Sequence, residues 1–442
     1  MSFPRYPSYK DSGVECLGEV PGHWNVSKLK RHLAFLTSGS RGWAEHYAED
    51  GPLFIRIGNL TRDGINLDLC DIQRVSVPSG AEGERTRVSA GDLLFSITAF
   101  LGSVAVVPED METAYVSQHV ALARLTKGRL LPKWAAYVAI SLVGKIHLES
   151  QGYGGTKIQL SLDDVANMPI TMPPDSEQRE ITTFLDRETA KIDALMAEQR
   201  ILIELLKEKR QAVISHAVTK GLNPDAPMKD SGVEWLGEVP EHWHIKPLKL
   251  IMEVLRGQFT HRPRNDPEYY DGDYPFIQTG DISGSARYIT DYKQTLNERG
   301  ASVSKEFPRG TLVMAIAANV GDVAILDFAA YFPDSIVGLI PSTESCLLYL
   351  YFLIGAMKHQ MQVTATMNTQ LNINTQQISS LIFPAPPQSE QSIIAAYLCD
   401  VTAKLDALTA EAEKSITLLQ ERRTALISAA VTGKIDVRGC AQ

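Results

Sequence analysis

The stretch KDSGVEWLGEVPEHWHIKPLK at residues 229–249 repeats, with few changes, the stretch KDSGVECLGEVPGHWNVSKLK at residues 10–30. A second pair follows in the same order. PPDSEQREITTFLDRETAKIDALMAEQ at 173–199 recurs as PPQSEQSIIAAYLCDVTAKLDALTAEA at 386–412. Two repeated motifs in one order indicate a tandem duplication. Each half contains a short motif, a long segment and a helical block.

The long segments between the motifs share only a skeleton. PLFIRIGNL at 52–60 matches YPFIQTGDI at 274–282, and both predict a strand that ends in a turn. The segments 90–107 and 309–326 each predict two short strands around a glycine-bearing turn. Each half is therefore expected to hold a mixed α/β domain. Its loops have either drifted in a duplicated structural module, or they differ because two recognition domains read different targets.

The helical blocks predict two long helices of about 44 residues, each about 66 Å long. Ser176 and Ser389 suit N-caps, and Gly221 and Gly433 suit C-terminal caps. A heptad-like apolar stripe is predicted at Leu185, Ile192, Leu195, Leu202, Leu206 and Val213, and in the second copy at Leu398, Val401, Leu405, Leu408, Leu419 and Leu426. Neither helix can bury its stripe alone, so we expect the two to pair in opposite directions within the chain. A coiled coil between two chains is the alternative.

Composition favours a soluble intracellular protein. A chain of 442 residues with 44% hydrophobic and 21% charged residues is typical of two or three globular domains. The five cysteines are scattered, which indicates neither a zinc site nor a disulfide framework. The N-terminus lacks a secretory signal, and the longest apolar run, 346–357, predicts a buried helix. The net charge of −9 argues mildly against nucleic acid, but a local basic loop can still bind phosphates.

The whole arrangement resembles the specificity subunit of a Type I restriction-modification system. The resemblance rests on the paired motifs SGVECLGEVPGHW and SGVEWLGEVPEHW, on the Pro-Pro-x-Ser-Glu-Gln that opens each helical block, and on AKIDAL and AKLDAL within the blocks. It covers nearly the whole chain. Two copies of each motif in the right order make it far more specific than any one motif.

The resemblance implies an α+β fold, in which two mixed α/β target recognition domains are joined by two long helices in an intramolecular antiparallel coiled coil with pseudo-two-fold symmetry. We expect the first recognition domain with its N-terminal motif at 1–172, the first long helix at 173–222, the second recognition domain with the repeated motif at 223–385, and the second long helix at 386–442. A helix pair of about 60 Å exceeds one turn of B-DNA, about 34 Å, so the domains could face separate groove segments.

In this family each recognition domain reads one half of a split sequence in double-stranded DNA, and the helices set the gap between the halves. Two copies of the methyltransferase (modification) subunit dock on the pseudo-symmetric chain and use S-adenosylmethionine to methylate adenine. Restriction (motor-nuclease) subunits complete an endonuclease that uses ATP and Mg. The resemblance therefore implies a cytoplasmic complex with these partners, no membrane, and no cofactor or metal in this chain.

The chain itself shows no catalytic motif. It has no phosphate-binding Gly-x-x-x-x-Gly-Lys-[Ser/Thr] loop, and no Asn-Pro-Pro-aromatic motif for gripping an extruded base. His23-Trp24 and His242-Trp243 recur at the entry to each domain. A histidine beside a tryptophan in such a place is more often a packing element than a catalytic group. We interpret the pairs as a clasp between recognition domain and helices, and the chain as a non-catalytic subunit.

Residues that read DNA are expected in the loops, because Arg, Lys, Asn, Gln, Ser and Thr are the side chains that read base edges. In the first domain the candidates are Ser38, Arg41, Asn59, Thr61, Arg62, Thr98, Thr156, Lys157 and Gln159. In the second they are Gln258, Thr260, His261, Arg262, Arg264, Gln278, Thr279, Asn319, Asn368, Gln370 and Asn372. The loops GQFTHRPR at 257–264 and GYGGTKIQ at 152–159 are the strongest of these.

Two other interpretations remain open. The chain could serve a different restriction architecture, such as a fused methyltransferase-nuclease. It could instead be a coiled-coil adaptor with two protein-binding heads and no role in DNA binding. An adaptor would show no sequence-dependent affinity for DNA in the presence of its partners.

Overall fold

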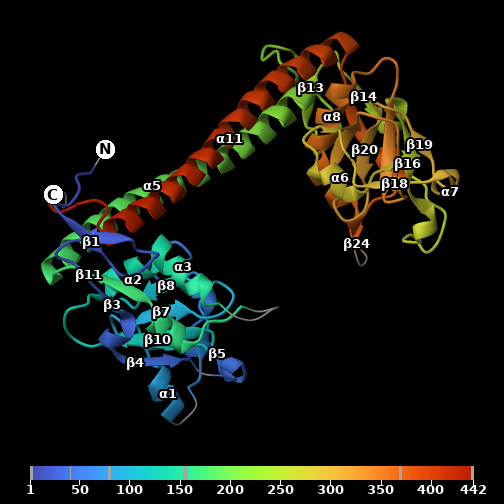
Figure 1. Ribbon diagram of the computed structural model, residues 1–442. Helices are drawn as coiled ribbons and strands as arrows, with labels where there is room; N and C mark the ends of the chain where they lie inside the picture. Colours follow the sequence, from blue (N-terminus) through green and yellow to red (C-terminus); the bar gives the residue numbers. More distant parts are fainter. Residues whose placement is uncertain (1–2, 40, 78–80, 153–157, 368–370, 440–442) are drawn as a thin grey trace. The chain divides into compact units, whose positions relative to one another are not determined.

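The structure, a computed structural model, describes residues 3–39, 41–77, 81–152, 158–367 and 371–439. The chain divides into two compact units. Unit 1 consists of Met1–Arg200 and Glu413–Gln442, and unit 2 of Ile201–Ala412. Each unit therefore combines one α/β domain with half of each of two long helices, α5 (Asp175–Lys220) and α11 (Gln388–Val431) (Figure 1). The two units therefore do not coincide with the two sequence repeats, because each unit also contains a helix segment from the other repeat.

Unit 1 is built on two larger sheets and two antiparallel strand pairs, β1-β2 and β11-β3. Its strands are β1 (Tyr9–Asp11), β2 (Glu19–Pro21), β3 (Asn25–Lys28), β4 (Leu33–Ser38), β5 (Tyr47–Ile55), β6 (Arg74–Val75), β7 (Leu93–Ser96), β8 (Val104–Val106), β9 (Ala114–Val116), β10 (Val120–Leu125) and β11 (Pro169–Met172). Its shorter helices are α1 (Ala81–Thr86), α2 (Pro132–Ile140), α3 (Leu142–Ser150) and α4 (Leu162–Ala166). One sheet has the antiparallel order β4-β10-β7-β8, and the other has the order β6-β5-β9 with β5 parallel to β9.

Unit 2 repeats this scaffold. Its strands are β12 (Met228–Asp230), β13 (Glu238–Pro240), β14 (His244–Pro247), β15 (Met252–Arg256), β16 (Tyr270–Phe276), β17 (Tyr288–Ile289), β18 (Gln294–Leu296), β19 (Glu306–Phe307), β20 (Leu312–Ala315), β21 (Val323–Leu326), β22 (Ala330–Tyr331), β23 (Ile336–Pro341), β24 (Thr366–Met367), β25 (Leu371–Asn372) and β26 (Ile382–Ala385). The shorter helices are α6 (Thr279–Gly284), α7 (Glu298–Ser302), α8 (Leu347–Ala356), α9 (Lys358–Thr364) and α10 (Thr375–Ser380).

The order β15-β23-β20-β21 in unit 2 reproduces β4-β10-β7-β8 in unit 1, and β17 is added at its edge, parallel to β21. The second sheet has the order β18-β16-β22-β19. The predicted strand pairs around a glycine turn are β7–β8 and β20–β21, and the predicted buried helix is α8. These predictions, and the mixed α/β character of both halves, are confirmed.

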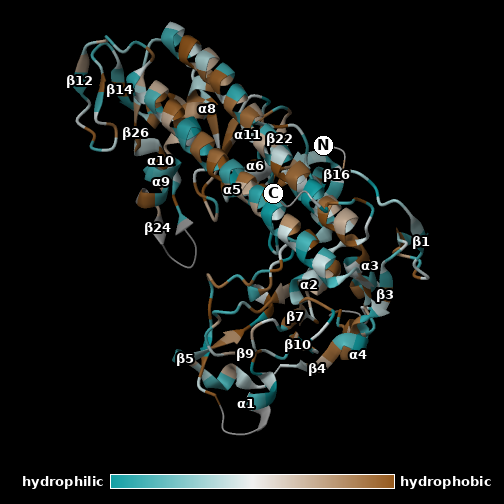
Figure 2. Cartoon of the chain, turned by 90° about the vertical axis from the view of Figure 1, so that its left-hand side faces the viewer, coloured by the Kyte–Doolittle hydropathy of each residue, from teal (hydrophilic) through white to brown (hydrophobic). Residues whose placement is uncertain are grey.

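The two long helices run in opposite directions in each unit, and one ion pair in each unit fixes their register. In unit 1 Arg423 Nε of α11 lies 2.9 Å from Asp193 Oδ1 of α5. In unit 2 Arg210 Nε of α5 lies 2.9 Å from Asp406 Oδ1 of α11. The aspartates belong to the repeated AKIDAL and AKLDAL motifs, so each repeat supplies the partner of the other. Apolar and polar residues alternate along both helices (Figure 2), and the predicted intramolecular antiparallel pairing is confirmed.

The predicted apolar stripe is only partly confirmed. Leu185, Ile192, Leu206, Leu398 and Leu405 are buried, and Val213, Val401, Leu419 and Leu426 are partly buried. The prediction is wrong at three positions: Leu195, Leu202 and Leu408 are 46%, 42% and 50% exposed.

Polar residues explain the error, because they occupy positions of the buried seam. Thr189 and Thr402 are buried, and their hydroxyls donate to the carbonyls of Leu185 and Leu398 four residues earlier, both at 2.7 Å. A threonine whose hydroxyl is paired in this way can face the other helix without an unsatisfied polar group. Following the seam through Thr189 leads to Met196, which is buried, instead of Leu195.

The predicted N-caps are wrong, whereas the predicted C-terminal caps are confirmed. Helix α5 begins at Asp175, so Ser176 lies inside its first turn, and the Gln178 amide donates to the Pro174 carbonyl at 3.0 Å. The first turn of α11 has the same arrangement around Ser389. Two consecutive prolines precede each helix, Pro173-Pro174 before α5 and Pro386-Pro387 before α11. Their restricted φ favours the extended backbone from which the helix starts.

At the other ends, Gly221 and Gly433 have φ of +75° and +70°, as a left-handed cap requires. A Cβ at Gly433 would also lie 2.3 Å from Pro21. Among the described residues, no helix is long and apolar enough to cross a membrane.

Candidate nucleic-acid interface

The repeated His-Trp pairs fix each α/β domain to a long helix. In unit 1 the Glu177 carboxylate of α5 accepts hydrogen bonds from Trp24 Nε1 at 3.1 Å and from the Tyr6 hydroxyl at 2.6 Å, and His23 Nε2 lies 2.8 Å away. In unit 2 Glu390 of α11 binds His242 and Trp243 at 2.8 and 3.0 Å. The predicted clasp is confirmed in both copies.

The neighbouring glutamine of the Ser-Glu-Gln motif serves the same purpose. The Gln178 side chain accepts from the amide of Leu131, directly before α2, at 3.0 Å. Gln391 accepts from the amide of Cys346, directly before α8, at 2.8 Å. Burial raises the pKa of the Tyr6 hydroxyl well above its ordinary value, and the hydrogen bond from this hydroxyl to Glu177 adds to the effect. Tyr6 therefore stays a neutral donor. The repeated motifs are therefore structural, and they hold the loops of each domain at a fixed place relative to the helices.

A tight turn after β7 in unit 1, and after β20 in unit 2, holds an alanine in a left-handed backbone conformation. Ala99 and Ala318, at equivalent positions in these turns, have φ of 59° and 62°. A left-handed alanine is strained and persists only where the surroundings impose it, and such strain is common at functional sites. Each turn also forms an isolated antiparallel bridge with a distant segment, Thr98 with Gln159 and Ala317 with Asn372. Three predicted candidates, Thr98, Gln159 and Asn372, thus lie at these equivalent bridges.

In unit 1 the turn gathers basic and aromatic side chains. The Arg62 guanidinium carbon lies 3.9 Å from the centre of the Phe100 ring, which is 41% exposed. Lys145 Nζ of α3 lies 3.4 Å from Asp63 Oδ1. These residues line a hollow of about 670 Å³ together with Ile158 and a second acidic residue, Glu149. An arginine stacked on an exposed aromatic ring suits contact with phosphates or bases. We call this set of residues 61–63, 98–103, Lys145 and 158–159 the unit 1 surface.

The remaining described candidates of unit 1 differ in how exposed they are and in whether hydrogen bonds within the chain already engage their side chains. Arg41 is exposed, and Ser38 is half-buried at the end of β4, where its carbonyl accepts from Arg85 at 3.1 Å. Thr61 is half-buried and donates to the Asn66 carbonyl at 3.4 Å. Asn59 is 4% exposed, and its amide holds the loop that follows it by donating to the carbonyls of Asp68 and Asp71, both at 2.9 Å. In this conformation Asn59 positions a loop and offers no donor to a base.

In unit 2 the predicted loop 257–264 lies beside an acidic residue that the sequence did not single out. Asp334 forms ion pairs with Arg264 and, at 3.5 Å, with Arg262. The side chains of Arg264 and Arg262 are nevertheless 45% and 53% exposed. His261 stacks on Tyr269 with ring centres 3.9 Å apart, and it lies 3.0 Å from Asp266. An amide hydrogen bond from Glu268 and the bond to His261 lower the pKa of Asp266, which keeps this partner anionic.

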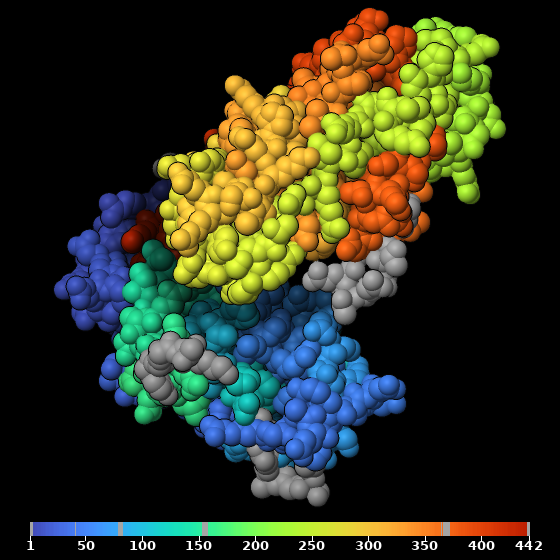
Figure 3. Space-filling model, turned by 90° about the vertical axis from the view of Figure 1, so that its right-hand side faces the viewer, coloured from blue at the N-terminus to red at the C-terminus, as the bar shows by residue number. Residues whose placement is uncertain are grey.

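The other described candidates of unit 2 lie in this loop, at the start of α6 and in the turn after β20. Arg264 and Gln278 line one hollow of about 260 Å³, where Gln278 Nε2 donates to Gln294 at 3.0 Å. Asn319 is exposed in the strained turn, and its Nδ2 donates to Ser283 at 2.9 Å. Thr279 is half-buried at the start of α6, while the exposed Gln258 and Thr260 flank Phe259. The face of unit 2 in Figure 3 consists largely of the yellow-green to orange segments that include these loops.

Four candidates, Thr156, Lys157, Asn368 and Gln370, lie outside the described residues. The structure adds Phe100, Lys145 and Asp334 to the site. An aromatic residue two positions before the turn glycine Gly102 was a usable signal for Phe100. Lys145 and Asp334 come from a helix and a loop that no local pattern connects with the candidates.

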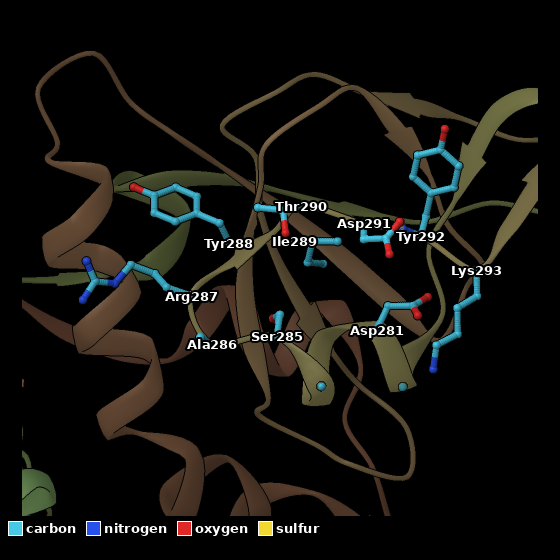
Figure 4. Close-up of a pocket in the computed structure, with 12 residues that line it drawn as sticks. Asp281, Ser285, Ala286, Arg287, Tyr288, Ile289, Thr290, Asp291, Tyr292 and Lys293 are labelled. Atoms are coloured by element: carbon cyan, nitrogen blue, oxygen red, sulfur yellow. Dashed lines mark hydrogen bonds between the residues drawn. The ribbon is translucent and has the colours of Figure 1, made fainter. Parts of the chain in front are cut away.

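A further hollow of about 500 Å³ in unit 2 is lined by residues 280–293, around the additional strand β17. Figure 4 shows Arg287 extended to one side of it, while Asp281 and Lys293 lie toward the other side. Its charged residues are two aspartates, one arginine and one lysine, the same balance of acids and bases as in the hollow of unit 1. Among the described residues no group of three or more His, Cys, Asp or Glu side chains is placed to hold a metal ion.

Known proteins share this organisation. The family model described as Type I restriction modification DNA specificity domain matches residues 71–205 and 240–418, more than half of the chain. A relative from Methanocaldococcus jannaschii, whose name describes the type I restriction enzyme MjaX specificity subunit, is 22% identical over 446 residues that cover 99% of both chains.

Two solved structures share the fold. A chain from a study of the assembly and conformational transition of the type I R-M system is 17% identical, with a TM-score of 0.74 over 93% of this chain and 98% of that one. The HsdS subunit from Thermoanaerobacter tengcongensis is also 17% identical, with a TM-score of 0.54 over 94% and 98%. With two matched domains and the same architecture, the chain belongs to the family of type I restriction-modification specificity subunits.

Proposed function

We propose that this chain reads a split, asymmetric sequence in double-stranded DNA, with unit 1 reading one half and unit 2 the other. One observation carries the proposal. The two units share the strand order β4-β10-β7-β8 and β15-β23-β20-β21, yet their equivalent loops differ: Phe100 stands where the other unit has Asn319, and the loop after β4 carries Arg41 where the loop after β15 carries Arg262 and Arg264. Shared sheets with different polar loops suit two readers with different targets.

The helix pair supports a second part of the proposal, that the chain docks two methyltransferase subunits. On α5, Leu195, Ile201, Leu202 and Leu205 are 42% to 61% exposed, and on α11 Leu408 and Leu418 are 50% and 54% exposed. Large aliphatic side chains at such exposure on a charged helix favour a protein partner. The repeated halves give the two copies of a partner equivalent places to bind.

The chemistry then belongs to the partners. We propose that the methyltransferase subunits use S-adenosylmethionine to methylate adenine, and that restriction subunits use ATP and Mg to move and cleave DNA. This chain contributes recognition and spacing without catalysis, in the cytoplasm where the DNA lies. The described surfaces carry Arg62, Lys145, Arg262 and Arg264 despite the net charge of −9, and partner subunits can supply further phosphate contacts.

The test is selection from random DNA duplexes with the complex of this chain and its methyltransferase partner, with the partner alone as control. The proposal predicts enrichment of two short, different motifs at a fixed separation, only when this chain is present. Salt must be held constant, because phosphate contacts make affinity strongly dependent on it. Copurification without any enriched motif would favour a protein-interaction adaptor.

A further inference from the structure

Arg423 of α11 occupies a place that its counterpart in the other repeat does not share. Its side chain is 8% exposed, and its Nε and Nη2 face the Asp193 carboxylate at 2.9 and 3.3 Å. Its third nitrogen, Nη1, donates to the backbone carbonyl of Asp63. One guanidinium thus joins both long helices to a loop of the α/β domain.

The carbonyl that Arg423 holds lies within the unit 1 surface. Asp63 directly follows Arg62, and the Arg62 guanidinium stacks on Phe100. The carboxylate of Asp63 pairs with Lys145. The short 3-10 helix before this loop ends at Asn59, and Gly64 follows it, so the loop has little regular structure of its own. Fixing one of its carbonyls to the helix pair therefore fixes where Arg62 stands.

The counterpart in unit 2, Arg210, makes the same ion pair without the loop contact. It faces Asp406 at 2.9 Å, its side chain is 34% exposed, and within the described part of the chain its hydrogen bonds and ion pairs reach only this aspartate. The pair Arg423 and Arg210 therefore separates two roles. Both arginines hold the helices together, and Arg423 alone also holds a loop.

Unit 2 ties its corresponding loop to the helices with the roles reversed. Arg287, just after α6, extends from the loop and donates to the Cys399 sulfur of α11 at 3.2 Å, while its guanidinium carbon lies 5.3 Å from the Phe352 ring centre. The Tyr351 hydroxyl donates to the Ala286 carbonyl at 3.0 Å. Figure 4 shows Arg287 directed away from the other charged residues of its hollow. A tie between loop and helix is thus present in both units, although the residues that make it differ.

We propose that Arg423 is a positioning residue for sequence reading by unit 1, which it serves by holding the Asp63 carbonyl and hence Arg62 at a fixed distance from the helix pair. The inference rests on the proposed function. Arginine suits this role because its planar group carries five donors in a fixed fork, whereas a lysine ammonium can keep the ion pair but cannot reach both partners in the same geometry.

The experiment is the random-duplex selection with the full chain and its methyltransferase partner, for wild type, R423K and R210K. Both variants keep a cation opposite the aspartate, and thermal unfolding of each complex is measured in parallel. We expect R423K to relax base preference in one half of the motif only, roughly tenfold at the affected positions. The other half and the separation stay unchanged, and R210K matches wild type throughout.

Three results would overturn the inference. An unchanged motif for R423K would show that the loop needs no such support. Equal weakening of both halves together with a lower unfolding temperature would show a purely structural role. Relaxation of a half-site by R210K would assign the effect to the ion pair and not to the loop contact. Absence of any split motif from wild type would instead contradict the proposed function, so the two failures are distinguishable.

Discussion

At the scale of single residues, the clasp carboxylates illustrate why a motif can recur without chemistry. Glu177 and Glu390 each hold a tryptophan N–H and a histidine of the preceding domain in the same repeat, and both lie in a Ser-Glu-Gln motif. They differ in burial, since the Glu177 side chain is 5% exposed and that of Glu390 is 28% exposed. The Tyr6 hydroxyl is an additional donor to Glu177.

This difference predicts unequal effects of the same substitution. E177A leaves the Trp24 and Tyr6 donors buried without an acceptor, which costs about 2–3 kcal/mol of unfolding free energy. E390A is expected to cost less, because water can reach the freed Trp243 donor. Hydrogen exchange of the hairpins β1–β2 and β12–β13, together with denaturant unfolding, measures both effects. Equal losses in the two variants would contradict the role assigned to burial.

A histidine gives unit 1 a predicted pH dependence. Burial, and secondarily the nearby Arg31, lowers the pKa of His32 below its ordinary value. The unfolded chain therefore binds a proton at this residue more readily, and stability falls as the pH drops through the unfolded pKa, about 6.5. H32Q should flatten the change in unfolding free energy between pH 7.5 and 5.5, measured by urea denaturation. A slope identical to that of wild type would refute the prediction.

At the scale of elements, the register of α5 and α11 follows from two reciprocal ion pairs, Asp193–Arg423 and Asp406–Arg210. Any change of length in one helix must be matched in the other to keep both pairs. Seven residues inserted within 197–208 and seven within 410–421 would preserve the seam. The helix pair would lengthen by about 10 Å, which corresponds to about three base pairs.

We therefore expect the matched insertion to widen the gap between the half-sites by about three base pairs and to leave both half-sites unaltered. Sequencing of the selected duplexes measures this directly, and insertion in α5 alone serves as the control that breaks the register. Altered half-sites with an unchanged gap would contradict the claim that the helices set the spacing.

The same helices show where prediction from sequence stopped. Their existence, C-terminal ends and pairing were predictable because the repeats mark equivalent positions and Gly221 and Gly433 mark the stops. The buried face was not, because Thr189 and Thr402 occupy the seam with their hydroxyls satisfied by backbone. A count of apolar residues passes over such positions. At these positions the packing of the two helices against each other decides which residues are buried.

The site was predictable to a similar degree. Thr98, Gln159 and Asn372 came from turn signals, and the structure places them at two equivalent bridges. The pairing of Arg264 with Asp334 was not accessible, because the two residues are far apart in sequence and no local pattern joins them. Asn59 was misleading, since an asparagine at a turn can as well hold a loop as read a base.

At the scale of the whole molecule, the duplication explains features that neither half explains alone. Each repeat donates a helix segment to both units, and each supplies the partner for the other's aspartate. A symmetric scaffold with unequal surfaces is what a pair of identical partners and an asymmetric DNA site together require. The central claim is therefore that this one chain specifies the site which its partners modify.

Methylome sequencing tests that claim most directly. A host carrying this chain with its modification subunit is compared with a host carrying the modification subunit alone. The account predicts adenine methylation at one split, asymmetric motif, present only in the first host. Copurification of both expressed proteins with no new motif, or the same motif in both hosts, would contradict it.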